Sequence, residues 1–184
     1  MRRLLAGLCA VIALSGSAPT AMAQNIGAEY AAAFQAFRFA GTDPDLNEQA
    51  RIIAATLPEL EGKWIRADIL AGEGPQFNAS RIADYCDSIV YALRQTAPHG
   101  FVMGRTNREG DVVLNIRHDY LGGRLFQRSA DENEVMASLG MDLLPGTMFI
   151  ATTYTGRVML YHPSQNILVM QRETWNAEIY ARCP

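Results

Sequence analysis

Few residues in this 184-residue chain have the types and spacing that catalysis requires. A zinc site needs three or four ligands from His, Cys and carboxylates. His118 is followed by Asp119, so in a strand these two side chains point to opposite faces, and His162 precedes Pro163 at an expected strand end. These two histidines and His99 are therefore interpreted as loop or rim residues. The common hydrolase, metalloprotease and nucleotide-binding motifs do not occur, so the sequence predicts no catalytic residue, no metal site and no cofactor.

Residues 1–23 have the features of a secretory signal peptide. Arg2 and Arg3 form a positive start, residues 4–14 are almost wholly apolar, and Ala21-Met22-Ala23 places small residues at a cleavage site before Gln24. The apolar run is shorter than the roughly 20 residues that a membrane span requires. We therefore expect cleavage between Ala23 and Gln24, export to the periplasm or extracellular space, and no integral membrane segment afterwards.

The cysteine count agrees with export. Of the three cysteines, Cys9 leaves with the signal peptide, which leaves Cys86 and Cys183. Two cysteines in an oxidising compartment most simply form a disulfide, and no Cys-x-x-Cys motif suggests a redox or metal role. We predict a structural Cys86–Cys183 disulfide.

The charge of the processed chain excludes some partners. Removal of Arg2 and Arg3 from 16 basic residues leaves 14 against 19 acidic residues, a net charge of −5. This balance argues against nucleic-acid binding, and no polybasic patch for anionic lipid is present.

Apolar residues suggest that a small ligand could be held inside the fold. Methionine fills irregular space and tolerates varied apolar guests, and several methionines and aromatic residues lie in the expected strands. The candidate ligand-binding residues are Tyr91, Phe101, Met103, Phe126, Phe149 and Tyr154. If the strands form an eight-stranded barrel, the same residues could instead form a filled core, because such a barrel is just wide enough either to be packed solid or to hold one ligand.

Helical periodicity comes first along the processed chain. Ile26, Tyr30, Phe34 and Phe37 recur at helical spacing up to Gly41, and a second amphipathic helix is expected over 46–57, ended by Pro58. We expect these helices to pack on the main domain or on each other. An exposed apolar face at Tyr30, Phe34 and Phe37 would favour a protein partner at this segment.

From Lys63 onward the apolar residues alternate with a period of two. A short helix is expected near 78–85 and another over 131–140, where Asp131 and Glu134 resemble a capping box. Short turns between the strands, including Leu121-Gly122-Gly123, force antiparallel neighbours, and one face of the sheet should be buried and the other wet. The expected strands cover 63–69, 89–93, 101–106, 112–117, 124–128, 147–154, 157–162, 167–173 and 177–182. We predict a mainly β chain: a helical segment over 24–60, then a small antiparallel up-and-down barrel of eight or nine strands over 61–184.

A Gly-x-Trp motif at Gly62 and Trp64 opens the first of these strands. Together with Arg182 in the closing strand, this motif resembles the lipocalin-like (calycin) barrels over about residues 60–183. The resemblance implies that Arg182 packs over Trp64 and shuts one end of the barrel, with Arg172 as the reserve candidate. The chain departs from the family in lacking a Thr-Asp-Tyr motif and in the helix expected over 131–140.

Three functions follow from these patterns. The first is an exported protein that binds a small apolar ligand or lipid in its barrel. The second is a non-catalytic envelope protein with a solid barrel that interacts through its surface or its N-terminal helices. The third is an enzyme, which would need polar residues such as Arg117, His118 or Arg128 to converge inside the barrel. We rank them in this order.

Overall fold

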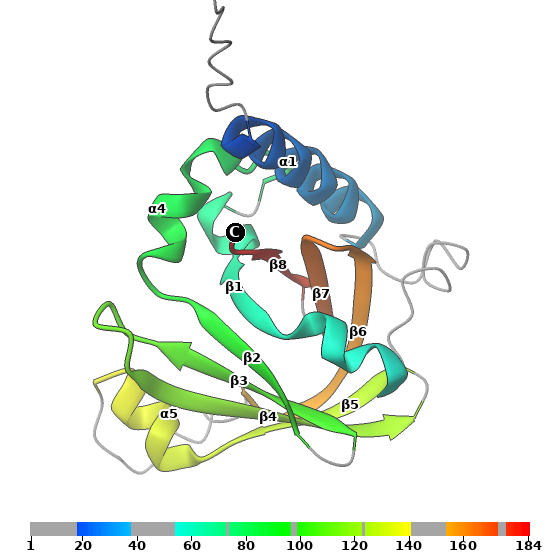
Figure 1. Ribbon diagram of the computed structural model, residues 1–184. Coiled ribbons are helices and arrows are strands. Elements are labelled where there is room, and N and C mark those ends of the chain that lie inside the picture. Colours follow the sequence, from blue (N-terminus) through cyan, green and yellow to red (C-terminus); the bar gives the residue numbers. More distant parts are fainter. Residues whose placement is uncertain are drawn as a thin grey trace, which may run out of the picture.

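The computed structural model describes residues 18–37, 54–72, 74–96, 99–122, 124–140, 154–172 and 176–184. Eight antiparallel strands form a closed barrel in which each strand pairs with the next and β8 pairs with β1 (Figure 1). The strands are β1 (Gly62–Arg66), β2 (Tyr91–Thr96), β3 (Gly100–Thr106), β4 (Val112–Gly122), β5 (Leu125–Ala130), β6 (Gly156–Ser164), β7 (Ile167–Arg172) and β8 (Glu178–Arg182). The predicted up-and-down barrel is confirmed.

The predicted ends of several strands differ from those observed, and two differences are large. The strand expected over 63–69 ends at Arg66, and α3 (Ala67–Leu70) follows it directly. The predicted turn at Leu121-Gly122 belongs instead to β4, which runs on to Gly122 through a register shift against β5. The strand predicted over 147–154 falls almost wholly outside the described residues.

The helices are α1 (Ala18–Phe37), the 3-10 helices η1 (Ala54–Leu60) and η2 (Ala79–Arg81), α3, α4 (Ile82–Cys86) and α5 (Glu132–Ser138). The Asp131 carboxylate accepts hydrogen bonds from the backbone N–H groups of Asn133 and Glu134, so the predicted cap of α5 is present. Most of the second predicted N-terminal helix lies outside the described residues. Pro58 does not end it, because η1 continues through this residue to Leu60.

Helix α1 packs against the outside of the barrel, over β7 and β8 (Figure 1). Tyr30, Phe34 and Phe37 lie in the core between this helix and the rest of the molecule and are at most 7% exposed. The Phe37 ring lies 4.8 Å from that of Tyr161, and Glu29 accepts a hydrogen bond of 2.7 Å from Ser164. The predicted packing of this helix on the main domain is confirmed, and its apolar face is covered by the barrel.

Because α1 and the short helices pack on the outside of β1, β7 and β8, this part of the barrel has two buried faces. Ile65, Val169 and Ala181 point outward from β1, β7 and β8, yet each is at most 1% exposed. The expectation of a wet outer face is therefore wrong for these strands. One apolar core lies between the barrel and its helices, and a second fills the barrel interior.

The predicted disulfide joins Cys86 at the end of α4 to Cys183 after β8, with a Cα–Cα distance of 5.8 Å. It holds the closing strand of the barrel to the helices on its outer side.

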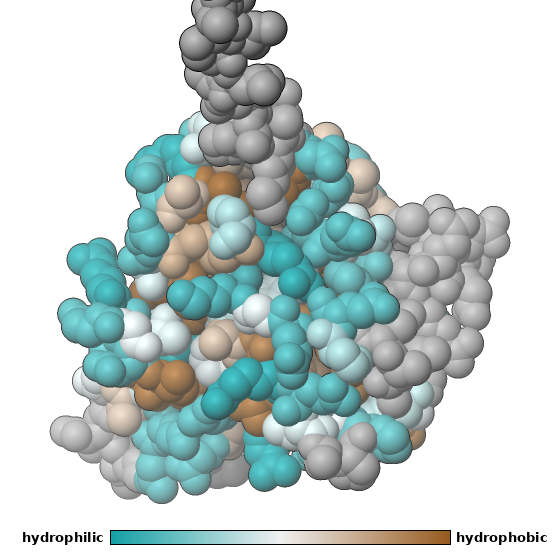
Figure 2. All heavy atoms as spheres, in the orientation of Figure 1, coloured by the Kyte–Doolittle hydropathy of each residue, from teal (hydrophilic) through white to brown (hydrophobic). Residues whose placement is uncertain are grey.

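Hydrophilic side chains cover most of the face shown in Figure 2, and the apolar side chains on it form smaller groups. None of the helices among the described residues has the length and apolar character needed to cross a membrane. The expected cleavage site between Ala23 and Gln24 lies within α1.

Candidate functional site

One end of the barrel is closed by Trp64 and Arg182. These residues are directly opposite each other on β1 and β8, and the Arg182 Cζ atom lies 4.5 Å from the centre of the indole ring. The Trp64 Nε1–H group donates a 2.9 Å hydrogen bond to the carbonyl of Leu60 in η1. The cation–π contact implied by the family resemblance is thus present in the structure.

Three backbone carbonyl groups hold Arg182 in this position. Its guanidinium donates to the carbonyls of Gln165 (2.9 Å), Glu61 (3.1 Å) and Glu59. Arg182 therefore links β8 to the turn between β6 and β7 and to η1. Because its donors are used in this way, Arg182 serves to close the barrel. The other inward-facing arginines lie at the opposite end.

At that opposite end, arginines occupy inward-facing positions on four alternate strands. Arg66, Arg105, Arg128 and Arg172 lie on β1, β3, β5 and β7, and each pairs across the sheet with an inward-facing neighbour. We call this group the arginine end. Arg128 is the most buried of the four, at 2% exposure.

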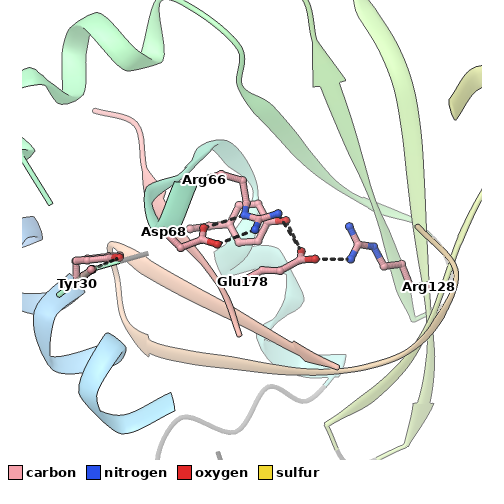
Figure 3. Close-up of polar contacts among 7 residues, drawn as sticks. Tyr30, Arg66, Asp68, Arg128 and Glu178 are labelled. Carbon is pink, nitrogen blue, oxygen red and sulfur yellow. Dashed lines mark hydrogen bonds and ion pairs between the residues drawn. The ribbon is translucent and has the colours of Figure 1, made fainter. Parts of the chain in front are cut away.

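Glu178 lies at the centre of the arginine end, between Arg66 and Arg128 (Figure 3). Arg128 Nη1 donates to Glu178 Oε1 over 3.0 Å, and the Tyr180 hydroxyl donates to Oε2 over 2.8 Å. Arg66 Nη1 lies 3.6 Å from Oε2 and uses its remaining donors on Asp68, at 2.8 and 2.6 Å. This chain of contacts crosses the interior of the barrel.

The arginines control the ionisation of this carboxylate. Burial by itself would raise the pKa of Glu178, but the charges of Arg128 and Arg66 outweigh it and lower the pKa to about 2. Burial and the Glu178 charge raise the pKa of Tyr180 well above its usual value, so this phenol stays a donor. Asp68 and Glu178 balance the charges of Arg66 and Arg128, and Arg105 adds a further positive charge at this end.

His118 lies next to the arginine end and has no exposed surface. It faces Arg128 across the β4–β5 pair, and its ring stacks on Phe101 at 4.3 Å with an interplanar angle of 5°. The Ile116 carbonyl lies near the imidazole, but neither ring nitrogen makes a hydrogen bond of good geometry to a described residue. Burial, followed by the charge of Arg128, lowers the pKa of His118 well below its usual value, so the ring is neutral.

The candidate ligand-binding residues fall into two groups. Tyr91 and Tyr154 lie at the arginine end: Tyr91 stacks edge-on against Tyr180, and the Tyr154 ring lies 5.5 Å from Arg128 Cζ. Phe101, Met103 and Phe126 lie in the centre of the barrel and are 0% exposed. Phe149 is outside the described residues. The ligand role of these residues stays a prediction.

Complete burial means that no water-sized space touches the three central side chains. A ligand between them would have to push them apart. The arginine end is less tightly closed, because Arg66, Arg105, Arg172 and Tyr154 are half-buried.

The residues named for a possible enzyme do not all converge. His118 and Arg128 face each other inside the barrel, whereas the exposed Arg117 points outward and lies 3.7 Å from Asp119. No group of three or more potential metal ligands occurs among the described residues.

Arg66 and Glu178 were missed by the sequence analysis, although a usable signal was present. Each lies two residues from an aromatic residue of the inward-facing row, Trp64 or Tyr180. In a strand, such spacing places both side chains on the same face. A charged residue at a position of the apolar face is therefore the signal that could have located the site.

Comparison of this chain with family models, with curated proteins and with solved structures finds no match. The candidate site consequently rests on its own geometry: a barrel closed at one end by Trp64 and Arg182, with buried arginines and one central carboxylate at the other.

Proposed function

We propose that this protein binds a small amphipathic molecule whose acidic group lies at the arginine end of the barrel. The observation that carries the proposal is the inward-facing, half-buried Arg105, which adds a positive charge at the end where Asp68 and Glu178 already balance Arg66 and Arg128. Buried charges are costly unless they are paired, so an anion at this end would be stabilised more strongly than at the surface. The apolar part of the ligand would contact Tyr91 and Tyr154.

We also propose that the barrel is of the lipocalin-like type and works after export. The closed eight-stranded topology and the Trp64–Arg182 contact support the first statement. The disulfide and the signal-like residues 1–23 support the second, because disulfides persist in oxidising compartments.

Binding of octanoate and of octan-1-ol to the purified protein tests the proposed ligand class. Titration calorimetry should show that octanoate binds at least about tenfold more tightly, because only the acid can pair with the arginines. Arg105→Met should weaken octanoate binding several-fold. Arg117→Met is the matched control, since Arg117 is an exposed arginine on the outer face, and should leave it unchanged. Equal binding of the acid and the alcohol, or no binding of either, would refute the proposal.

A second function is favoured by the filled centre of the barrel. The 0% exposure of Phe101, Met103 and Phe126 fits a solid, non-catalytic envelope protein that acts through its surface. Native mass spectrometry of the purified protein separates the two candidates. A co-purifying acid of defined mass supports the binding protein, whereas a clean mass and no thermal shift with octanoate support the solid barrel.

A further inference from the structure

Two buried side chains that face each other across β4 and β5 have nitrogen atoms without a hydrogen bond of good geometry to a described residue. Arg128 Nε is buried and donates no hydrogen bond, although Nη1 of the same side chain is bound to Glu178. Both ring nitrogens of His118 are likewise buried without a hydrogen bond of good geometry, although the Ile116 carbonyl lies near the ring. Unpaired polar groups of this kind are rare in folded proteins, and a missing ligand or water is a common reason.

The two groups have complementary chemistry. Arg128 Nε–H is a donor under all conditions. His118 is neutral, because burial and the Arg128 charge lower its pKa, so one ring nitrogen is an acceptor. The Ile116 carbonyl near the ring favours the proton on the nitrogen that faces it, which leaves the other nitrogen to accept.

A group that satisfies both must accept from Arg128 and donate to His118. A carboxylate can only accept, and an ammonium group can only donate. A hydroxyl group does both. Because Arg128 also belongs to the arginine end, such a hydroxyl would lie next to the acidic group of a bound anion.

We propose that the ligand of this barrel is a hydroxy acid, whose hydroxyl oxygen accepts from Arg128 Nε and whose hydroxyl proton is donated to His118. This inference rests on the proposed function, since the acidic group is the one that the arginines would hold. His118 is 0% exposed, so no water-sized space touches its ring and the side chains around it must shift when the hydroxyl of such a ligand enters. Tyr154 is one of the side chains next to Arg128, with its ring 5.5 Å from Arg128 Cζ.

The test compares octanoate with 2-hydroxyoctanoate by titration calorimetry. The hydroxy acid should bind about tenfold more tightly, as expected for satisfying buried donors and acceptors that are otherwise unpaired. His118→Phe keeps an aromatic ring against Phe101 and removes both nitrogens, so the preference should fall to within about twofold. His99→Phe, at an exposed histidine, should keep the tenfold preference.

The outcomes separate the two proposals. If both acids bind the wild-type protein with equal affinity, the hydroxy-acid inference is refuted and the proposed function stands. If neither acid binds, both are refuted. A preference that persists in a folded His118→Phe variant also refutes the role of His118.

The comparison of lactate with propionate repeats the test with acids that lack the long alkyl chain. If the protein prefers lactate to propionate, the site is assigned to short hydroxy acids. If it shows a preference only between the two longer acids, the site is assigned to amphipathic hydroxy acids.

Discussion

The ion pair between Arg128 and Glu178 joins two strands that are not neighbours in the barrel. Arg128 comes from β5 and Glu178 from β8, and their side chains meet in the interior. A buried pair of this kind gives little net stability compared with apolar residues, but the loss of one partner leaves a buried charge uncompensated. The pair therefore fixes one arrangement of the inner side chains.

Glu178→Gln should strongly destabilise the protein. The substitution leaves the buried Arg128 without the carboxylate that neutralises it, while Arg66 keeps its pair with Asp68, and a loss of about 3 kcal/mol or more in the free energy of unfolding is expected. Urea unfolding followed by circular dichroism measures this change. Glu109→Gln, at an exposed turn residue, is the control and should change the free energy little. A loss for Glu178→Gln below about 1 kcal/mol would contradict the structure.

His118 should make the protein less stable in mild acid. Its pKa in the folded state lies well below the value of about 6.5 in the unfolded chain, so the unfolded state binds the proton first as the pH falls. Stability is therefore full above about pH 6.5 and decreases below it, by up to about 1.4 kcal/mol per pH unit.

His118→Phe should flatten the stability profile between about pH 6.5 and 5. The pKa of His162 is also lowered, mainly by burial and next by Arg182, so His162→Gln is needed as a comparison. An unchanged slope in His118→Phe would show that His118 is not buried as a neutral ring.

Single residues were predictable where one pattern governed them. The Cys86–Cys183 disulfide followed from the count of cysteines, and the Trp64–Arg182 contact from a resemblance. The arginine end was not foreseen, because its members are scattered over β1, β3, β5, β7 and β8 and meet only when the barrel closes. Composition and local spacing contain no information about such long-range convergence.

At the scale of elements, β1, β8 and η1 together close one end of the barrel, and we call this end, with Trp64 and Arg182, the plug. Arg182 connects all three through its stacking on Trp64 and its hydrogen bonds to backbone carbonyls. The planar guanidinium can make several directed hydrogen bonds at once, which a lysine ammonium group on a flexible chain cannot reproduce.

Arg182→Lys should therefore lower the free energy of unfolding by about 2 kcal/mol despite keeping the charge. Thermal and urea unfolding measure the loss. Arg157→Lys, at an exposed position in β6, is the control. If both variants are equally stable, the plug depends on charge alone.

The elements show where the period-two pattern was sufficient and where it was not. It located all eight described strands, because alternation is strong and the turns are short. It failed after β1, since Ala67 and Ile69 continue the alternation of Ile65 although the chain turns into α3. Ile69 is 61% exposed there, so the pattern was a coincidence of composition.

At the scale of the whole molecule, α1 and the disulfide cover the same side of the barrel. Helix α1 buries Tyr30 and Phe37 over the sheet, and the disulfide ties β8 to α4 beside it. The sequence could not predict that helices would bury the outer face of β1, β7 and β8, because their outward apolar residues look the same in an exposed sheet.

Replacing both cysteines by alanine should lower the free energy of unfolding by up to about 4–5 kcal/mol. The two cysteines are 97 residues apart, so the bond greatly restricts the unfolded chain. Urea unfolding of the wild-type protein with and without reductant should reproduce the same loss. The alanine variant should not respond to reductant, and a response would point to an effect unrelated to this bond.

Strand β8 gives the molecule a particular order of events during synthesis. Within five residues it supplies the central carboxylate, Tyr180 and the plug arginine, and Cys183 follows at once. A ribosome that has reached residue 170 has made nearly seven strands, but β1 and the incomplete β7 are still open edges that could pair with other chains. Barrel closure, neutralisation of Arg128 and formation of the disulfide therefore all wait for these last residues, and until then the open strand edges are exposed to pairing with other chains.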